Sequence, residues 1–418
     1  MKKLLIAVLC LMLTGCAAPA PSDGSGPDRS VSPDIPAPSP AASSAPNGES
    51  GPPQASPETD PETAENPSAS QEPSESSLGP QNQEQIIQEL LSAMTLEEKV
   101  GQMFFVRCPE TGGAELAAQY KVGGYLLFGR DFKDKTAQQV RDDIQSYQDA
   151  SGIPLLIGTD EEGGTVVRAS SNPDLFPQRE PAPQTLFAQG GMDLILQDAR
   201  QKSMTLLDLG VNVNFAPVAD VSTDPADFIY ARSFGQDAQA TANYVAQVVG
   251  VMGEEQIGSV LKHFPGYGNN VDTHTGIALD QRPYETFQTS DFLPFQAGIQ
   301  AGADAVLVSH NIAASMDESL PASLSPTVHK VLREELGFDG VVLTDDLAMD
   351  AVMEYAQNGS AAVLAIQAGN DMVVTTDFQT QIPQVIHAVQ SGVIAESQID
   401  QAVTRVLNWK YELGLLGN

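Results

Sequence analysis

Hydrophobic residues along the chain fall into short runs that alternate with longer amphipathic stretches. Eight runs rich in Val, Leu and Ile have the length of buried strands: 103–106, 124–128, 155–159, 211–217, 259–263, 305–309, 340–344 and 372–375. Between most of them the spacing of apolar residues predicts helices, as at 137–151, 192–209, 238–254 and 360–368. Apolar strands separated by helices are typical of a parallel sheet covered on its outer face. Eight such units predict an α/β fold, a single (β/α)8 TIM-type barrel.

A doubly wound nucleotide-binding fold is the competing architecture for this pattern. That fold would place a glycine-rich phosphate loop directly after the first strand. No such loop follows 103–106, and no shorter internal repeat stands out. The barrel is therefore the favoured prediction.

The first residues have the pattern of an export signal. Lys2 and Lys3 precede an apolar run over 4–13, which is too short to cross a bilayer as a helix. The run ends in Leu-Thr-Gly-Cys, which resembles a bacterial lipobox, in which Cys16 is acylated and becomes the mature N-terminus. We expect a lipoprotein signal peptide over 1–15 and an exported protein, lipid-anchored to the cell membrane and facing the cell wall. The alternative is an ordinary cleavage site followed by a free Cys.

The segment after Cys16 has the composition of a linker. Residues 17–80 contain 15 of the 29 prolines, 14 serines, ten acidic residues, one base and no aromatic residue. Such a stretch buries too little apolar surface to offset its conformational entropy, and its prolines keep it extended. We predict a disordered acidic linker over 16–82 and one domain over 83–418. Cys108 is the one cysteine left in that domain, so no intrachain disulfide is expected.

The charge balance excludes one class of partner. The chain has 21 Lys and Arg residues against 54 Asp and Glu residues, a net charge of −33. Subtracting the linker's −9 and the signal's +2 leaves −26 on 81–418. A nucleic-acid binder needs clustered bases to neutralise phosphates, so no nucleic-acid partner is expected.

Polar residues follow several of the predicted strands. Asp160 follows 155–159, Lys262 and His263 end 259–263, and His310 follows 305–309. In a barrel, catalytic residues gather at the C-terminal ends of the strands. The sequence therefore predicts a site at that end. Two further histidines, His329 and His387, fall in helical patterns and are predicted to be surface residues. Lys330 is predicted to lie on a helix surface as well.

Two carboxylates, Asp345 and Asp346, follow the run 340–344. Because side chains alternate along a strand, we expect one of the two to face the barrel axis. A carboxylate there can attack an anomeric carbon, abstract a proton or bind a metal. The alternative is that an Asp caps a following helix, and one Asp can cap while the other does chemistry.

A long polar loop follows the strand 259–263. It contains Asp272 and His274, whose i, i+2 spacing puts both side chains on the same side of an extended loop. A carboxylate that hydrogen-bonds an imidazole fixes its tautomer and stabilises the imidazolium, so the pair can deliver and retrieve a proton. A metal-binding loop or a surface ion pair fits the same residues.

Basic residues near predicted strand ends stand out because bases are scarce. Arg168, Arg232 and Lys262 lie in or just after such loops. A sugar hydroxyl both donates and accepts hydrogen bonds, so an Asp beside an Arg or a Lys suits it. A structural ion pair is the alternative for each.

Several motifs together resemble one family. They are L-E-E-K-V-G-Q-M at 96–103, D-E-E-G-G-T-V-V-R at 160–168, N-F-A-P-V-A-D at 214–220, R-S-F-G at 232–235, K-H-F-P-G-Y-G-N-N-V-D-T-H at 262–274, P-A-S-L-S-P at 321–326, L-T-D-D-L-A-M at 343–349 and K-Y-E-L-G-L-L at 410–416. In this order they resemble the β-N-acetylhexosaminidase branch of glycoside hydrolase family 3. The resemblance covers the domain from about 85 to 418.

The resemblance implies a retaining glycosidase that releases terminal, non-reducing β-linked N-acetylglucosamine from small substrates such as muropeptides. Matched positions make Asp345 the nucleophile, His274 the acid/base and Asp272 its partner. The sugar-binding positions of the family match Asp160, Arg168, Arg232, Lys262 and His263. The resemblance implies no cofactor and no metal, and we expect a monomer.

Two positions depart from the family pattern. Tyr267 stands where the family usually has His, which is expected to alter the packing around the dyad. Glu161 replaces a common Gln, which is expected to add a charge beside the sugar pocket and to shift substrate preference. Three alternative functions stay open: a phosphorylase, a β-glucosidase and, in another class, a solute-binding lipoprotein.

Overall fold

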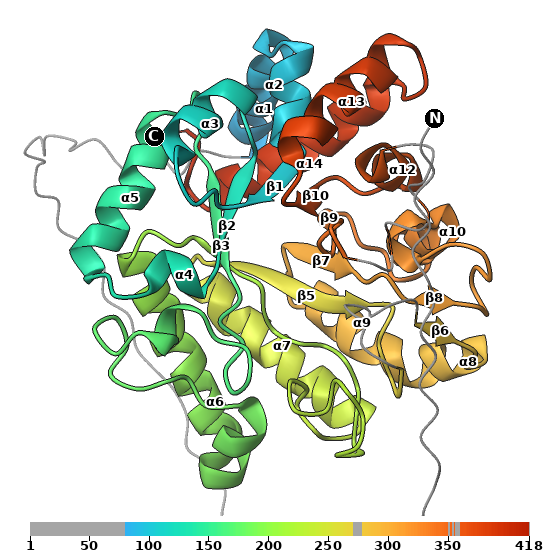
Figure 1. Ribbon diagram of the computed structural model, residues 1–418. Helices are drawn as coiled ribbons and strands as arrows, with labels where there is room; N and C mark the ends of the chain where they lie inside the picture. Colours follow the sequence, from blue (N-terminus) through green and yellow to red (C-terminus); the bar gives the residue numbers. More distant parts are fainter. Residues whose placement is uncertain (1–79, 271–277, 350–351, 353–354, 356–359, 418) are drawn as a thin grey trace, which may run out of the picture. The chain divides into compact units, whose positions relative to one another are not determined.

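The computed structural model describes residues 80–417 except 271–277, 350–351, 353–354 and 356–359. Eight parallel strands form one sheet, in the order β10-β1-β2-β3-β4-β5-β7-β9 (Figure 1). They are β1 (Phe104–Arg107), β2 (Gly124–Leu127), β3 (Leu156–Thr159), β4 (Val213–Asn214), β5 (Gly258–Phe264), β7 (Ala305–Val308), β9 (Val341–Thr344) and β10 (Val373–Thr375). A separate parallel pair joins β6 (Leu279–Asp280) to β8 (Ile312–Ala313).

The two ends of the eight-stranded sheet meet. The N–H of Met372 donates to the carbonyl of Val342 at 3.1 Å, and the N–H of Thr344 donates to the carbonyl of Met372 at 3.3 Å. These bonds connect β9 to the start of β10, which closes the barrel. The predicted (β/α)8 barrel is confirmed, and each of the eight predicted apolar runs overlaps one strand of the sheet.

Helices surround the strands (Figure 1). They are α1 (Pro80–Ala93), α2 (Leu96–Gln102), α3 (Gly113–Tyr120), α4 (Gly129–Phe132), α5 (Ala137–Asp149), α6 (Pro183–Asp208), α7 (Ala238–Glu254), α8 (Tyr284–Thr286), α9 (Phe292–Gln300), α10 (Pro326–Lys330), α12 (Ala361–Ala368), α13 (Phe378–Gln390) and α14 (Glu396–Glu412). Among these described helices none is long and apolar enough to cross a membrane.

Two predicted elements differ in extent. The helix predicted at 192–209 begins earlier, at Pro183, and bends at Gly191, where φ is 66°. The glycines at 190–191 interrupt the apolar spacing, which hides the first turns from a periodicity argument. The strand predicted at 211–217 is regular only over Val213–Asn214, because the N–H of Ala216 donates to the carbonyl of Asn214 at 2.8 Å and Pro217 has no N–H to donate. Pairing resumes at Val218.

The core has two layers. One cluster fills the barrel interior and includes Phe105, Phe215 and Trp409. Trp409 comes from α14 and is 2% exposed, and a Cβ on Gly258 at the start of β5 would lie 3.0 Å from its ring. Helix α14 therefore packs against the N-terminal end of the barrel. The second, larger cluster lies between the strands and the surrounding helices.

The prediction that His329 is a surface residue is wrong. It is 4% exposed and its Nδ1 lies 2.8 Å from the carbonyl of Ser325. Helix α10 presses this face against Gly369, which comes from a distant part of the chain that helical periodicity cannot indicate. His387 and Lys330 are exposed, as predicted.

Candidate active site

A cavity of about 320 Å³ opens at the C-terminal ends of the strands. Six predicted site residues line it: Asp160, Arg168, Arg232, Lys262, His263 and Asp345. They come from the ends of β3, β5 and β9 and from the loops that follow β3 and β4. The other predicted residues, Asp272, His274 and Cys16, lie outside the described residues. The predicted gathering of polar side chains at this end is confirmed for the six.

Asp160 holds two of the cavity's cations. Its Oδ1 lies 2.7 Å from Nζ of Lys262, and its Oδ2 accepts a hydrogen bond from Arg168 at 3.2 Å. The Asp160 side chain is 15% exposed and that of Lys262 only 2%, so the pair is shielded from water. Charged donors and acceptors then lie side by side at the cavity wall, an arrangement that suits a sugar hydroxyl.

Glu162 was not predicted as a site residue, yet it organises the cations. Its carboxylate accepts two hydrogen bonds from Arg232, at 2.9 and 2.7 Å, and lies 2.6 Å from Nζ of Lys262. Burial favours the protonated form, but the charges of Arg232 and Lys262 outweigh it and hold the pKa of Glu162 well below its ordinary value. Three successive acidic residues at a strand end did not indicate which of them the fold would bury.

Asp220 orients His263. Its Oδ2 lies 2.7 Å from Nδ1 of His263 and also accepts the backbone N–H of His263 at 3.0 Å. On the other side of the ring, Nη2 of Arg232 lies 3.0 Å from Nε2. Because a guanidinium only donates, Nε2 accepts and Nδ1 carries the proton that is donated to Asp220. Asp220 follows a predicted strand, so the signal that indicated Asp160 could also have found it.

Asp345 and Asp346 both line the cavity. The expectation that only one would face the barrel axis is wrong, because β9 ends at Thr344 and the alternation of a strand ends with it. The Oδ1 of Asp345 accepts the N–H of Asp346 at 2.8 Å, and the Oδ1 of Asp346 accepts the N–H of Ala348 at 3.0 Å. Asp346 thus fixes the following turn.

His310 stabilises the same turn through a hydrogen bond to its backbone. It is fully buried, and its Nε2 lies 3.0 Å from the carbonyl oxygen of Asp346. Its Nδ1 lies 2.7 Å from the hydroxyl of Ser323. Since a carbonyl only accepts, Nε2 donates. The strand-end histidine therefore fixes the backbone that carries the two carboxylates.

Glu161 does not contribute to the cavity that Asp160 and Asp345 line. Its carboxylate accepts backbone N–H groups of Arg168, Ala169 and Ser170, at 2.9, 2.7 and 3.3 Å, and it is fully buried. The expectation of a charge beside the sugar pocket is therefore wrong. The side chain turns into the loop that follows β3 and fixes it to the barrel.

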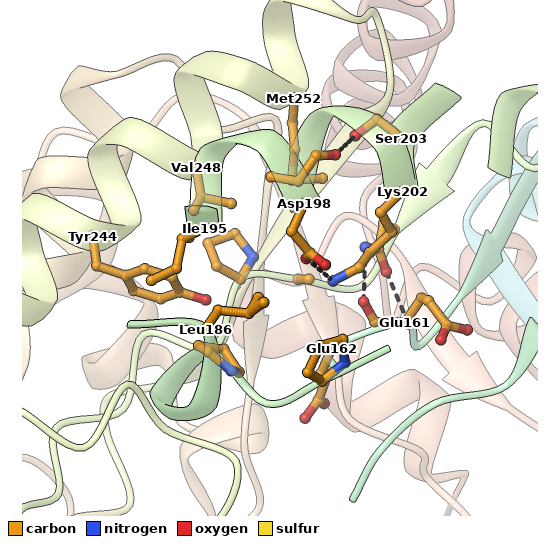
Figure 2. Close-up of a pocket in the computed structure, with 16 residues that line it drawn as sticks. Glu161, Glu162, Leu186, Ile195, Asp198, Lys202, Ser203, Tyr244, Val248 and Met252 are labelled. Atoms are coloured by element: carbon orange, nitrogen blue, oxygen red, sulfur yellow. Dashed lines mark hydrogen bonds and ion pairs between the residues drawn. The ribbon is translucent and has the colours of Figure 1, made fainter. Parts of the chain in front are cut away.

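Glu161 and Glu162 border a second, much smaller cavity between α6 and α7 (Figure 2). Its volume is about 30 Å³, which suffices for a water but not for a sugar. In this region Lys202 pairs with Asp198 at 3.0 Å, as Figure 2 shows. Burial lowers the pKa of Lys202, but the nearby carboxylates outweigh burial and raise it overall. The cluster balances charge behind the loop after β3.

Tyr267 packs against the site. It is 1% exposed and meets the ring of His263 edge-on, with centroids 5.2 Å apart. Its N–H donates to Oδ1 of Asp220 at 2.8 Å. The residue that departs from the family pattern thus contacts His263, which lines the cavity, whereas the dyad whose packing it was expected to alter lies outside the described residues.

An ion cluster anchors the chain on both sides of 271–277. Arg282 pairs with Asp280 at 2.7 Å and with Asp291 at 3.0 Å, and it donates to the carbonyl of Gly266 at 3.2 Å. Gly266 has φ +117°, and a Cβ there would come within 2.4 Å of Asp291. A glycine is therefore required where the chain leaves β5.

Among the described residues, no three His, Cys, Asp or Glu side chains converge in the way metal ligands would. What those residues do provide is a carboxylate, Asp345, facing a set of paired donors and acceptors. This arrangement can hold a polyhydroxylated ring and bring a carboxylate to its reacting carbon.

Comparison with known proteins identifies relatives over most of the domain. The model of the glycosyl hydrolase family 3 N-terminal domain matches residues 95–409. A β-hexosaminidase of Stenotrophomonas maltophilia is 35% identical over 318 residues, which cover 73% of this chain and 89% of that protein. A β-hexosaminidase of Xanthomonas campestris pv. campestris is 32% identical over 315 residues, which cover 73% and 90%.

Solved structures give the same picture. A glycoside hydrolase family 3 β-N-acetylglucosaminidase from Paenibacillus superposes with a TM-score of 0.71 at 30% identity, covering 78% of this chain and 64% of that one. A β-N-acetylhexosaminidase from Beutenbergia cavernae superposes with a TM-score of 0.65 at 29% identity, covering 75% of this chain and 98% of that one.

Proposed function

This chain belongs to glycosyl hydrolase family 3 and is a glycoside hydrolase of the β-N-acetylhexosaminidase class, and from that premise we propose that it is a retaining exo-enzyme that releases terminal β-linked N-acetylglucosamine. The observation that supports the proposal best is the position of Asp345, which lines the same cavity as the network of Asp160, Arg168, Arg232, Lys262 and His263. A ring bound to that network has Asp345 within the same enclosed space.

The proposed reaction has two steps. Asp345 attacks the anomeric carbon, while His274 as imidazolium protonates the departing oxygen with Asp272 as its partner. The glycosyl–Asp345 ester is then hydrolysed by a water that His274 deprotonates, and the sugar leaves with its configuration retained. Lys262, Arg232 and Arg168 bind hydroxyls, and Asp160 and Glu162 keep these cations in place.

Hydrolysis of 4-nitrophenyl β-N-acetylglucosaminide tests the proposal. Asp345→Asn removes the nucleophile, so turnover should fall by roughly 10⁴-fold or more. Asp339→Asn is the matched control, because Asp339 is an exposed residue that precedes the same strand. Proton NMR should show the β-anomer as the first product. Full activity of Asp345→Asn would refute the role of this carboxylate, and an initial α-anomer would show inversion.

We further propose that the natural substrates are peptidoglycan fragments and that the protein is a lipoprotein anchored through Cys16, exported to the membrane face that meets the cell wall. The signal-like residues and the acidic Pro/Ser-rich linker support this location. A labelled fatty acid should be incorporated into the wild type but not into Cys16→Ser. Cys10→Ser is the control, because Cys10 would be removed with the signal. Labelling of both variants alike would contradict the anchor.

A further inference from the structure

Arg107 stands out among the cations of the cavity. It is the last residue of β1, its side chain lines the cavity, and its guanidinium carbon lies 4.3 Å from the centre of the Phe128 ring. Its Nε is buried without a hydrogen-bond partner. In the described part of the chain no ion pair joins Arg107 to a carboxylate, although the whole chain carries a net charge of −33.

The other cations of the cavity each have a carboxylate. Arg168 and Lys262 pair with Asp160, at 3.2 and 2.7 Å, and Arg232 pairs with Glu162 at 2.7 Å. Those pairs offset part of the cost of placing charge in a partly enclosed space. Among the residues that the structure describes, no carboxylate pairs with the guanidinium of Arg107 in this way. The contrast points to a group bound in the cavity as the partner of Arg107.

The ring of Phe128 fixes how Arg107 can bind. A guanidinium stacked on an aromatic face has its plane held, while the N–H groups along its edge stay available. That edge matches the two oxygens of a carboxylate or a phosphate through parallel hydrogen bonds. An uncharged hydroxyl does not need this fork. The geometry therefore favours an oxyanion over a neutral group.

The charges of Asp346 and Arg107 attract each other across the cavity wall. Burial raises the pKa of Asp346, and the charge of Arg107 partly opposes this rise. The two side chains line the same cavity and interact through their charges, with no hydrogen bond between them in the described structure. Asp346 already accepts the N–H of Ala348, which it holds in the turn after β9. Arg107 is therefore near the turn that carries Asp345 while keeping its own hydrogen-bonding edge for another group.

We propose that Arg107 binds an oxyanion of the reacting molecules: a carboxylate carried by the leaving sugar, or a phosphate ion that replaces water as acceptor. The proposal rests on the proposed function, because it names the substrate class of the same site. Arg107 would then be a specificity-determining residue that selects charged over neutral substrates of one linkage.

Two disaccharides that differ by one charged group test the carboxylate. Both carry a terminal β-linked N-acetylglucosamine. In the neutral disaccharide the leaving sugar is N-acetylglucosamine. In the charged one it is N-acetylmuramic acid, which differs by a lactyl ether that ends in a carboxylate. Arg107→Gln should lower the ratio of kcat/KM for the charged over the neutral disaccharide by about tenfold to a hundredfold, the scale of a hydrogen bond to a charged group. Arg107→Lys should restore part of it. Arg141→Gln, at an exposed surface pair with Asp208, is the matched control.

The same variants, assayed with and without inorganic phosphate, test whether the bound oxyanion is a phosphate acceptor. A phosphate-dependent release of sugar 1-phosphate that Arg107→Gln weakens would assign the oxyanion to the acceptor. If the ratio between the disaccharides stays within twofold of wild type and phosphate has no effect that depends on Arg107, the proposal is overturned. An equal loss of kcat/KM on both disaccharides would also overturn the proposal. Such a loss would show that Arg107 acts on Asp345 and Asp346 and does not recognise the charged group.

Calorimetry separates this proposal from the proposed function. If the wild type hydrolyses none of these N-acetylglucosaminides, the proposed function fails. Binding of N-acetylmuramic acid, of N-acetylglucosamine and of phosphate to the full chain then tests Arg107 without turnover. Preferential binding of either anion, lost in Arg107→Gln but not in Arg141→Gln, would support the oxyanion site, and no preference would refute it.

Discussion

Replacing Glu162 with Gln removes one carboxylate that holds two buried cations. In the wild type this carboxylate makes contacts at 2.9 and 2.7 Å with Arg232 and at 2.6 Å with Lys262. Lys262 would keep Asp160 at 2.7 Å, whereas Arg232 would keep, among the described residues, the ring of His263 at 3.0 Å. Removing one partner of a buried pair costs about 3–5 kcal/mol. Because Gln still accepts one hydrogen bond, we expect a loss near the lower end, about 3 kcal/mol.

Urea unfolding of the full chain measures this loss. Glu110→Gln is the matched control, since the Glu110 side chain is 77% exposed and pairs with Arg130, and such a surface pair contributes about 0–1 kcal/mol. Activity should fall as well, by about tenfold to a hundredfold in kcat/KM, because Arg232 and Lys262 lose the group that positions them.

The pH dependence gives a second check on Glu162. Its pKa in the folded protein lies below the ordinary value of 4.5, so its stabilising contribution is present above pH 4.5 and is lost as pH falls below it. The difference in stability between wild type and Glu162→Gln should therefore shrink in acid. A loss as small as that of Glu110→Gln, with unchanged activity, would refute the reasoning.

Three further substitutions test separate features. Glu161→Gln should cost about 1–3 kcal/mol in urea unfolding, because the amide NH2 would face backbone donors. The same variant should leave the ratio of activities on nitrophenyl N-acetylglucosaminide and glucoside unchanged, and a changed ratio would return Glu161 to the sugar pocket. Asp220→Asn should lower kcat/KM at least about tenfold, because an amide no longer fixes the tautomer of His263; a kcat/KM within about twofold of wild type would contradict this. Burial lowers the pKa of Lys410 to about 7 from 10.5, so the unfolded chain binds more protons between these values and the free energy of unfolding should rise from pH 7 to pH 9. Lys410→Met should abolish that rise, and an equal slope in both proteins would disprove the shift.

Local patterns were sufficient for the barrel and for most of the cavity wall. Each strand of a parallel barrel is buried on both faces, so it appears as an apolar run, and each of the eight runs overlaps a strand. Strand ends in a barrel converge at one rim, so Asp160, Lys262 and Asp345 could be grouped from their positions alone. The six predicted residues within the described chain line one cavity for this reason.

Side-chain direction beyond a strand end did not follow from the sequence. Three successive acidic residues after β3 have three different roles: Asp160 lines the cavity, Glu161 holds the loop, and Glu162 lies under the cations. The backbone turns after Thr159, so the strand's alternation no longer applies. The same limit explains why both Asp345 and Asp346 line the cavity.

The sequence by itself determined the barrel, the end of it that carries the chemistry, and the residue types that gather there, because these depend on periodicity and on the ends of strands. The tertiary structure decided which charges meet. Asp220 reaches His263 from 43 positions away and Glu162 reaches Lys262 from 100 positions away. It also left Arg107 without an ion pair to a described carboxylate in the same cavity. Such pairings depend on distances across the barrel mouth, which no local pattern encodes.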